Sequence, residues 1–177
     1  MLEIIDFVRS ILEQSPHIAY LIVGVGIFFA ATFPFSFFWY GEFIFIPASI
    51  LIGIGVLHIL PVFIASVIWA LVGDMINYFL GYRYGRKMFH PDKRFLNPKN
   101  LEKGEEIFKK YGVWWVFFAK FIPLIPWTVS FLAWVHRMNI VAFILIDILA
   151  GVLIFGWIYW GFSGGVHMIA QIWNILR

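Results

Sequence analysis

Long apolar runs, interrupted by prolines, glycines and single charges, dominate this chain. Residues 17–41 include no Asp, Glu, Lys or Arg, and a membrane-crossing helix needs only about 20 apolar residues. A second apolar run covers residues 59–82 and carries Asp74 near its end. From residue 111 onward the chain is apolar apart from four charged side chains, Lys120, Arg137, Asp147 and Arg177. This pattern predicts a polytopic, all-α integral membrane protein.

The N-terminal segment has a different pattern. In residues 1–16, apolar and charged positions recur with an approximately helical spacing that ends at Pro16. We expect a short helix lying in the membrane interface. A cleavable signal peptide is not expected, because Glu3, Asp6 and Glu13 make this segment acidic as often as basic.

Two apolar segments contain too many helix breakers for straight lipid-facing helices. In FPFSFFWYGEFIFIPA, residues 33–48, the breakers and the single charge are Pro34, Gly41, Glu42 and Pro47. In AKFIPLIPW, residues 119–127, Lys120 is followed by Pro123 and Pro126, which prevent a continuous helix. Irregular backbone at membrane depth persists only where it is buried in protein or lines a wet cavity. We therefore expect a re-entrant hairpin in each segment.

The two hairpins fall in a weak internal repeat. A shift of 78 residues aligns Glu42 with Lys120 and Gly73 with Gly151. If each unit holds one hairpin and one full crossing, the number of crossings per unit is odd, so the two units must be inverted relative to each other. In inverted-repeat transporters, broken helices of both halves form the binding site near the midplane. We expect two oppositely oriented re-entrant hairpins, with the first repeat at residues 30–85 and the second at 111–165.

The segments outside the repeats complete a single membrane domain over residues 1–177. Residues 83–110 contain nine Lys or Arg and four Asp or Glu, so the positive-inside rule predicts a basic cytoplasmic loop at 86–110. Residues 166–177 form either a C-terminal interfacial helix or the end of a span.

Composition narrows the class of function. The chain is 62% hydrophobic and 13% charged, with a mean hydropathy of +0.88, far from the charged content of soluble domains. Without cysteine, thiol chemistry is excluded. The net charge of +3 does not indicate nucleic acid, because the basic residues cluster in one loop. The five histidines lack metal-ligand spacing, and no nucleotide or nucleophile motif is present. We expect a transporter without metal or cofactor, not an enzyme.

Glu42 and Lys120 are the first candidates for the chemistry of a binding site. Each ionisable group at membrane depth costs at least about 2.5–3.5 kcal/mol unless it is paired or hydrated. Opposed hairpins would let Glu42 and Lys120 pair, or let Lys120 meet an anionic headgroup while Glu42 exchanges protons. Alternatively, one or both side chains extend to an interface.

Three other charged residues lie in or beside the apolar runs. Asp74 is a second proton-coupling candidate, or it is held near the headgroups by a neighbouring arginine, Arg83 or Arg86. Asp147 is a third proton-coupling candidate. Arg137 either lies at an interface or contacts substrate.

The order of these motifs resembles that of the DedA family. The resemblance comprises FPFSFFWYGEFIFIP at 33–47, G-D-x-x-x-Y-x-x-G-x-x-x-G at 73–85, YG at 111–112, basic-Phe-x-Pro at 120–123 and the Gly/Trp-rich end GVLIFGWIYWGFSGG. It covers about residues 30–165, and it is the order and spacing of the motifs together that are specific.

The resemblance implies a multi-pass protein of the bacterial inner membrane with two re-entrant loops of opposite orientation. It also implies movement of lipids, including undecaprenyl phosphate and phosphatidylethanolamine, with dependence on the proton motive force. The membrane acids of the family fall on Glu42 and Asp74, and its first essential arginine falls on Lys120. Where the family reads Arg-Phe-x-Pro-Gly-x-Arg, this chain has Lys120, Leu124 and Pro126 in place of Arg, Gly and Arg. Lysine is a point charge without the bidentate fork of arginine.

The leading hypothesis is a lipid translocase whose substrate is a polyprenyl phosphate or a phospholipid, with protons as the coupling partner. Lys120, Glu42, Arg137, Pro123 and Pro126 would form its substrate site. A proton-coupled antiporter of small cations or drugs is the alternative, followed by a structural membrane factor. No nucleic-acid partner is expected, and a homo-oligomer is left open.

Overall fold

Helices make up the described part of the chain. The computed structural model describes residues 16–32, 35, 41–88, 90, 98–122 and 126–175, apart from some side chains within the helices. The elements, in chain order, are α2 (Pro16–Ala31), α3 (Glu42–Gly53), α4 (Ile59–Tyr84), the 3-10 helix η2 (Gly85–Met88), α5 (Pro98–Tyr111), α6 (Val113–Ala119), α7 (Pro126–Val135) and α8 (Ile140–Ile175). The all-α class predicted from the sequence is confirmed for these residues. The interfacial helix expected before Pro16 lies outside them.

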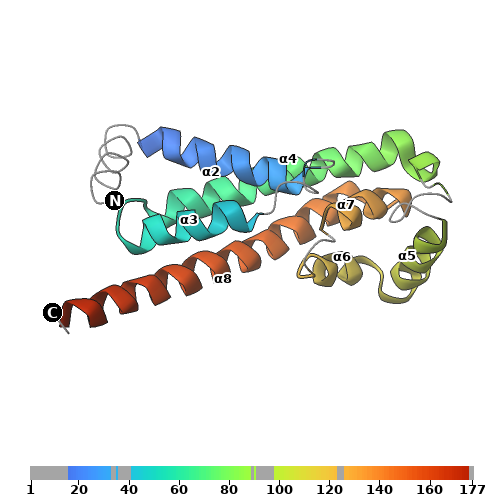
Figure 1. The fold of residues 1–177 in the computed structure, drawn as a ribbon. Helices are drawn as coiled ribbons and strands as arrows, with labels where there is room; N and C mark the ends of the chain where they lie inside the picture. Colours follow the sequence, from blue (N-terminus) through green and yellow to red (C-terminus); the bar gives the residue numbers. More distant parts are fainter. Residues whose placement is uncertain are drawn as a thin grey trace.

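The two longest helices form the frame of the molecule. Figure 1 shows α4 and α8 running in opposite directions along the length of the bundle, with α2 and α3 near one end and α5, α6 and α7 near the other. By length and composition, α4 and residues Ile140–Val166 of α8 are long and apolar enough to cross a membrane. The second spanning run predicted from the sequence, residues 59–82, is confirmed as a continuous helix.

Each half of the frame has its own apolar core. One core joins α2 and α3 to the first turns of α4 and the later turns of α8; its buried members are Ala19, Val23, Ile27, Ala48, Leu57, Val62, Phe155 and Tyr159. The other joins α6 and α7 to the later part of α4 and the beginning of α8; its buried members are Tyr78, Val116, Ala119, Val129, Ala133, Met138 and Phe143. One group of short helices therefore packs on each end of the α4–α8 pair.

The turns that lead into α4 and α8 have the same backbone geometry. After α3, the amide of Gly55 donates to the carbonyl of Ile52 and that of Val56 donates to Leu51. After α7, Arg137 donates to Trp134 and Met138 donates to Ala133 in the same pattern, which closes a helix by the Schellman motif. The left-handed residues of the two turns are Gly55, with φ of 78°, and Arg137, with φ of 55°. A short helix, a Schellman turn and a long helix thus occur twice. This order is consistent with two repeats, and their inverted orientation stays a prediction.

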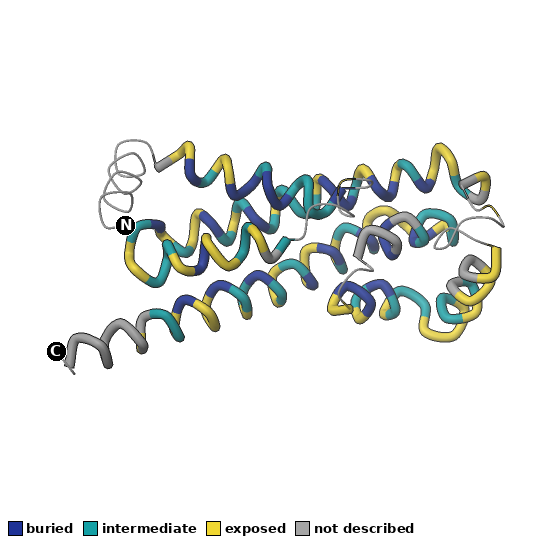
Figure 2. Tube along the Cα trace, in the orientation of Figure 1, coloured by how far each residue is buried: buried dark blue, intermediate teal, exposed yellow. Residues whose placement is uncertain are grey.

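The outer surface of the long helices is apolar, as the core is. Exposed positions recur along α4 and α8 (Figure 2). Many of them are large hydrophobic residues, among them Ile68, Phe79, Leu145, Leu153 and Trp157. A protein in water rarely exposes so much contiguous apolar surface. The structure is therefore that of a helix bundle embedded in lipid.

The predicted basic loop contains a helix, and the predicted C-terminal helix continues α8. The basic segment at 86–110 contains most of α5, whose amphipathic sequence includes Lys109 and Lys110 in its last turn. Residues 166–175 continue α8 without interruption. With 36 residues, α8 is about 54 Å long, which exceeds the roughly 30 Å hydrocarbon core of a bilayer. Residues 166–175 are therefore the end of this helix.

Candidate functional site

Lys120 is buried between two carboxylates that come from the two long helices. Its ammonium nitrogen lies 2.6 Å from Oδ2 of Asp74 on α4 and forms a second ion pair with Oδ1 of Asp147 on α8. Lys120, Asp74 and Asp147 are only 8%, 6% and 5% exposed. Together with Ser130 on α7, these residues form what we call the Lys120 cluster. It joins four separate segments of the chain.

The break in the helix at Lys120 places its side chain in the bundle. Helix α6 ends at Ala119, and Lys120 is its C-cap residue. The next amides, of Phe121 and Ile122, donate to the carbonyls of Phe118 and Ala119, a tight turn that does not continue the helix. A cation is favoured at a helix C-terminus because the last carbonyls carry partial negative charge. The helix interruption predicted in this segment is confirmed at Lys120–Ile122.

Close contact between α2 and α4 fixes the position of Asp74. A Cβ at the preceding residue, Gly73, would lie 2.8 Å from Oγ1 of Thr32 and 2.9 Å from Cβ of Ala31. Only glycine lets the two helices approach this closely. One turn further, Nδ2 of Asn77 donates to the carbonyl of Ala31 over 2.7 Å. Both contacts hold α4 against the C-terminus of α2.

Ser130 completes the hydrogen bonding of Asp74. Its hydroxyl donates to Oδ1 of Asp74 over 2.5 Å, while Oδ2 pairs with Lys120. Ser130 is fully buried. Both carboxylate oxygens of Asp74 therefore have a donor, which a buried charge requires.

The cluster contains more negative than positive charge. When all its groups are ionised, Asp74 and Asp147 oppose the single ammonium of Lys120, so one negative charge is in excess. An uncompensated charge is strongly disfavoured in a low-dielectric interior. The arrangement can therefore attract a proton or another cation. It also holds a buried ammonium that an anion could engage.

Aromatic rings close one side of the cluster. The Lys120 ammonium lies 5.8 Å from the centroid of the Phe143 ring, which stacks on Tyr78 at 4.9 Å between centroids. The hydroxyl of Tyr78 donates to the carbonyl of Met138 over 2.7 Å. This wall is apolar toward Lys120, and it leaves the carboxylates as the main partners of the ammonium.

The structure brings together three of the predicted site residues. Asp74, Lys120 and Asp147 meet, although the sequence suggested a Glu42–Lys120 pair and treated the two aspartates separately. Glu42 begins α3, but its side chain lies outside the described residues, so its pairing stays a prediction.

The other predicted substrate residues have a less direct relation to the cluster. Pro123 lies outside the described residues, whereas Pro126 is the first residue of α7, where a missing amide donor has no cost. Arg137 is exposed in the Schellman turn before α8. The contacts of the Lys120 cluster within the described residues do not include Arg137, and its role in substrate binding also stays a prediction.

Sequence reasoning missed Ser130. A single hydroxyl in the apolar segment PWTVSFLAWV gives no periodic or spacing signal. For the ion pairs of Lys120, charge balance gave a signal. Two acids and one lysine within apolar runs each need a partner, and one lysine can pair with both acids.

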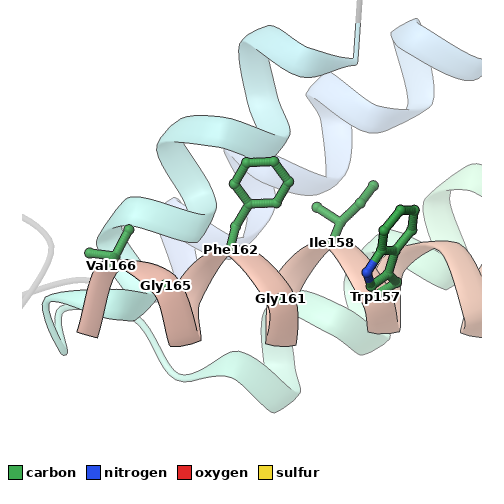
Figure 3. A pocket seen from close by; sticks show the side chains of 6 residues that line it. All are labelled: Trp157, Ile158, Gly161, Phe162, Gly165 and Val166. Atoms are coloured by element: carbon green, nitrogen blue, oxygen red, sulfur yellow. The ribbon is translucent and has the colours of Figure 1, made fainter. Parts of the chain in front are cut away.

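An apolar groove lies on α8, further along the helix than the Lys120 cluster. It has a volume of about 460 Å³ and is lined by Trp157, Ile158, Gly161, Phe162, Gly165 and Val166. In Figure 3 the side chains of Phe162, Ile158 and Val166 extend from α8 toward a neighbouring helix. Trp157 is ten residues beyond Asp147, or about 15 Å along the helix. The lining offers hydrocarbon and no charge, so it does not form a second polar site. In the described residues, no group of His, Asp and Glu side chains is arranged to hold a metal ion.

Comparison with known proteins identifies the class to which this helical fold and buried charge cluster belong. Residues 33–163 match the VTT domain family. This range includes Asp74, Lys120 and Asp147 of the Lys120 cluster. The chain belongs to this family, the DedA family that its motifs resembled.

Individual relatives are similar over part of their length. Undecaprenyl phosphate transporter A of Staphylococcus aureus is 35% identical over 101 residues, which cover 52% of this chain and 49% of that protein. The Bacillus subtilis protein of the same name is 30% identical over 98 residues, covering 54% and 50%. Protein DedA of Escherichia coli is 28% identical over 117 residues, covering 64% and 53%. The chain thus aligns with about half the length of these curated relatives. No solved structure matches it.

Proposed function

We propose that this protein is a lipid translocase that moves a phosphate-bearing lipid, such as undecaprenyl phosphate or a phospholipid, across the bacterial inner membrane. The observation that carries the proposal is the buried ammonium of Lys120, held between Asp74 and Asp147. Two relatives bear the name undecaprenyl phosphate transporter A, which supports a phosphorylated lipid as substrate.

In this mechanism Lys120 binds the headgroup phosphate. The aspartates neutralise the ammonium while the site is empty, so a charge can remain at membrane depth between transport events. An arriving phosphate offers anionic oxygens in exchange for a carboxylate. Since lysine is a point charge, Lys120 accepts phosphomonoesters and phosphodiesters without a fixed bidentate geometry. The lipid tails stay in the bilayer during the exchange.

The proton motive force drives the cycle through the acids of the site. Glu42, Asp74 and Asp147 are the candidate proton carriers, because protonation removes a negative charge that competes with phosphate for Lys120. The helix break at Lys120 belongs to the second of two re-entrant hairpins, and Glu42 to the first. Irregular backbone of this kind is tolerated at membrane depth where it lines a polar passage.

Reconstitution with a labelled lipid tests the proposal. In proteoliposomes, Lys120→Ala should abolish headgroup-dependent flipping of a phosphate lipid, while Lys120→Arg should retain it. Lys110→Ala is the matched control, because Lys110 is exposed at the end of α5 and packs over the ring of Tyr111. Equal flipping by Lys120→Ala and Lys110→Ala at matched reconstitution would refute the headgroup role of Lys120.

A proton-coupled antiporter of small cations or drugs is the second candidate. The excess negative charge of the Lys120 cluster favours it, since two carboxylates can bind a cation when Lys120 withdraws. This function predicts proton movement in vesicles on addition of cation, without translocation of labelled lipid.

A further inference from the structure

The two carboxylates that hold Lys120 differ in their hydrogen bonding. Asp74 receives Lys120 on Oδ2 and the Ser130 hydroxyl on Oδ1. On Asp147, Oδ1 faces Lys120 and, apart from this ion pair, has no hydrogen-bond donor. Hydrogen bonds donated to a carboxylate favour its ionised form. The charged form is therefore better supported on Asp74 than on Asp147.

This asymmetry decides where an added proton goes. A single proton removes the excess negative charge of the cluster. Placed on Asp74, it would disturb the hydrogen bond from Ser130 or the short ion pair with Lys120. Placed on Asp147, it leaves both interactions of Asp74 in place.

We propose that Asp147 is the carboxylate that carries the proton, and that Ser130 is the positioning residue that reserves Asp74 for Lys120. The inference rests on the proposed function, because it takes the Lys120 cluster as the transport site. It selects one carrier from the three acids considered above and gives a role to Ser130.

The surroundings of Asp147 contain few other groups that titrate. In the described residues the charged groups that act on it are Lys120, at the end of α6, and Asp74, on α4. Helix α7 contributes the Ser130 hydroxyl to Asp74. The phenol of Tyr78, whose ring stacks on Phe143, donates to the carbonyl of Met138. Protonation of Asp147 therefore mainly weakens its ion pair with Lys120.

The proton step is a simple exchange. A proton from the aqueous side with the higher proton concentration binds the Asp147 carboxylate, which becomes a neutral carboxylic acid. Lys120 keeps its own proton and remains an ammonium, now balanced by Asp74 alone. Its pairing with Asp147 is weakened, so the ammonium can accept the phosphate of a lipid. Deprotonation of Asp147 toward the other side restores the second ion pair and displaces the phosphate.

Infrared difference spectroscopy of the purified protein in nanodiscs tests the assignment without any transport. A pH titration of the wild type should show the C=O band of a protonated carboxylic acid. Asp147→Glu keeps the charge of the cluster and should shift the frequency of this band, whereas Asp74→Glu should leave it unchanged. The reverse result, with the band shifted in Asp74→Glu and unchanged in Asp147→Glu, would overturn the assignment. If Asp147→Glu does not fold, the Asp74→Glu protein alone decides, because a shifted band contradicts the proposal.

The role of Ser130 needs its own variants. Without the Ser130 hydroxyl, Asp74 loses one donor and should share the proton. We therefore expect Ser130→Ala combined with Asp74→Glu to shift part of the carboxylic acid band. Ser130→Thr in the same background keeps a hydroxyl donor and should leave the band unchanged. An unchanged band in both double variants would refute the positioning role.

A flipping assay separates this inference from the proposed function. Flipping of a labelled phospholipid by the wild type should accelerate when a pH gradient is applied, and Asp147→Asn should lose that response. If the wild type flips no lipid, the proposed function fails, while the infrared result still decides which acid carries the proton. If Asp147→Asn flips lipid with the full response to the gradient, Asp147 is not the carrier.

Discussion

The ammonium of Lys120 lies 2.6 Å from Oδ2 of Asp74, although 46 positions separate the two residues in the sequence. Lys120 stands at a break between two short helices and Asp74 within a long apolar one. The contact therefore ties the interrupted segment of the second half to a spanning helix of the first half. Asp147, on the other long helix, shares the same ammonium, so the geometry of the site depends on how α4 and α8 pack.

Removing the lysine should destabilise the protein through the charges left behind. Lys120→Met leaves two buried carboxylates without their ammonium, and loss of one partner of a buried ion pair typically costs about 3–5 kcal/mol. Unfolding in detergent should show a loss of this size. Lys110→Met, at an exposed position, should change the free energy of unfolding by less than about 0.5 kcal/mol.

Neutralising the acids should reverse that loss. The triple variant Lys120→Met, Asp74→Asn, Asp147→Asn contains no buried charge in the cluster, and we expect it to recover most of the lost stability without recovering lipid flipping. A triple variant as unstable as Lys120→Met alone would show that packing, and not charge, gives Lys120 its structural importance.

The close approach of α2 and α4 at Gly73 gives a prediction about packing. An alanine there would press its Cβ against Ala31, at 2.9 Å, and against the carbonyl of Phe28, at 3.2 Å. Overpacking of this kind costs about 1–3 kcal/mol, and Gly73→Ala should lower the free energy of unfolding accordingly. Gly164→Ala, on an open face of α8 with no atom within 4 Å, should be neutral or stabilising by up to about 1 kcal/mol. Equal effects of the two changes would contradict the contact.

The two Schellman turns predict that Arg137→Gly stabilises the protein and that Gly55→Ala destabilises it. Arg137 has a left-handed backbone, with φ of 55°, which costs an ordinary residue about 1–2 kcal/mol. Arg137→Gly should raise the melting temperature by relieving this strain. Gly55→Ala, at φ of 78° with nothing within 4 Å of the added Cβ, should lower it for backbone reasons alone. A destabilised Arg137→Gly protein would indicate that the arginine side chain contributes more than its backbone costs.

The hydroxyls of Ser66 and Tyr159 link α4 and α8 in the other half of the bundle. Their oxygens are 2.8 Å apart, and the Ser66 hydroxyl also bonds the carbonyl of Val62 at 2.7 Å. A double-mutant cycle of Ser66→Ala and Tyr159→Phe should give a coupling energy of about 0.6 kcal/mol, as for hydrogen bonds between membrane helices. A coupling energy of zero would mean that the pair does not connect the helices.

The apolar helices of the fold could be predicted because hydrophobic length alone marks them. The run from Ile59 became α4, and the prolines after Lys120 marked a helix break. The lengths of α3 and α8 were harder to predict. Helices that are apolar on every side have no amphipathic period to show which face packs inward, and Pro47 lies inside α3 instead of ending it.

The partners of Lys120 could not be read from the sequence for a related reason. Alignment of the two repeats placed Glu42 opposite Lys120, but a weak repeat does not give the crossing of α4 and α8 that brings Asp74 and Asp147 together. Ser130 was beyond prediction, because its importance comes only from the carboxylate that lies beside it in space.

The exchange of partners by Lys120 is the central claim, and solid-state NMR can measure it directly. With 15N-labelled lysine and 13C-labelled aspartate, the Lys120 ammonium, assigned by its loss in Lys120→Met, should be close to aspartate carboxyl carbons in bilayers of lipids without phosphate. On addition of a phosphate lipid and acidification, the same nitrogen should show dipolar coupling to 31P. A Lys120 nitrogen that stays coupled only to aspartate carbons, whatever lipid and pH are present, would contradict headgroup binding at this site.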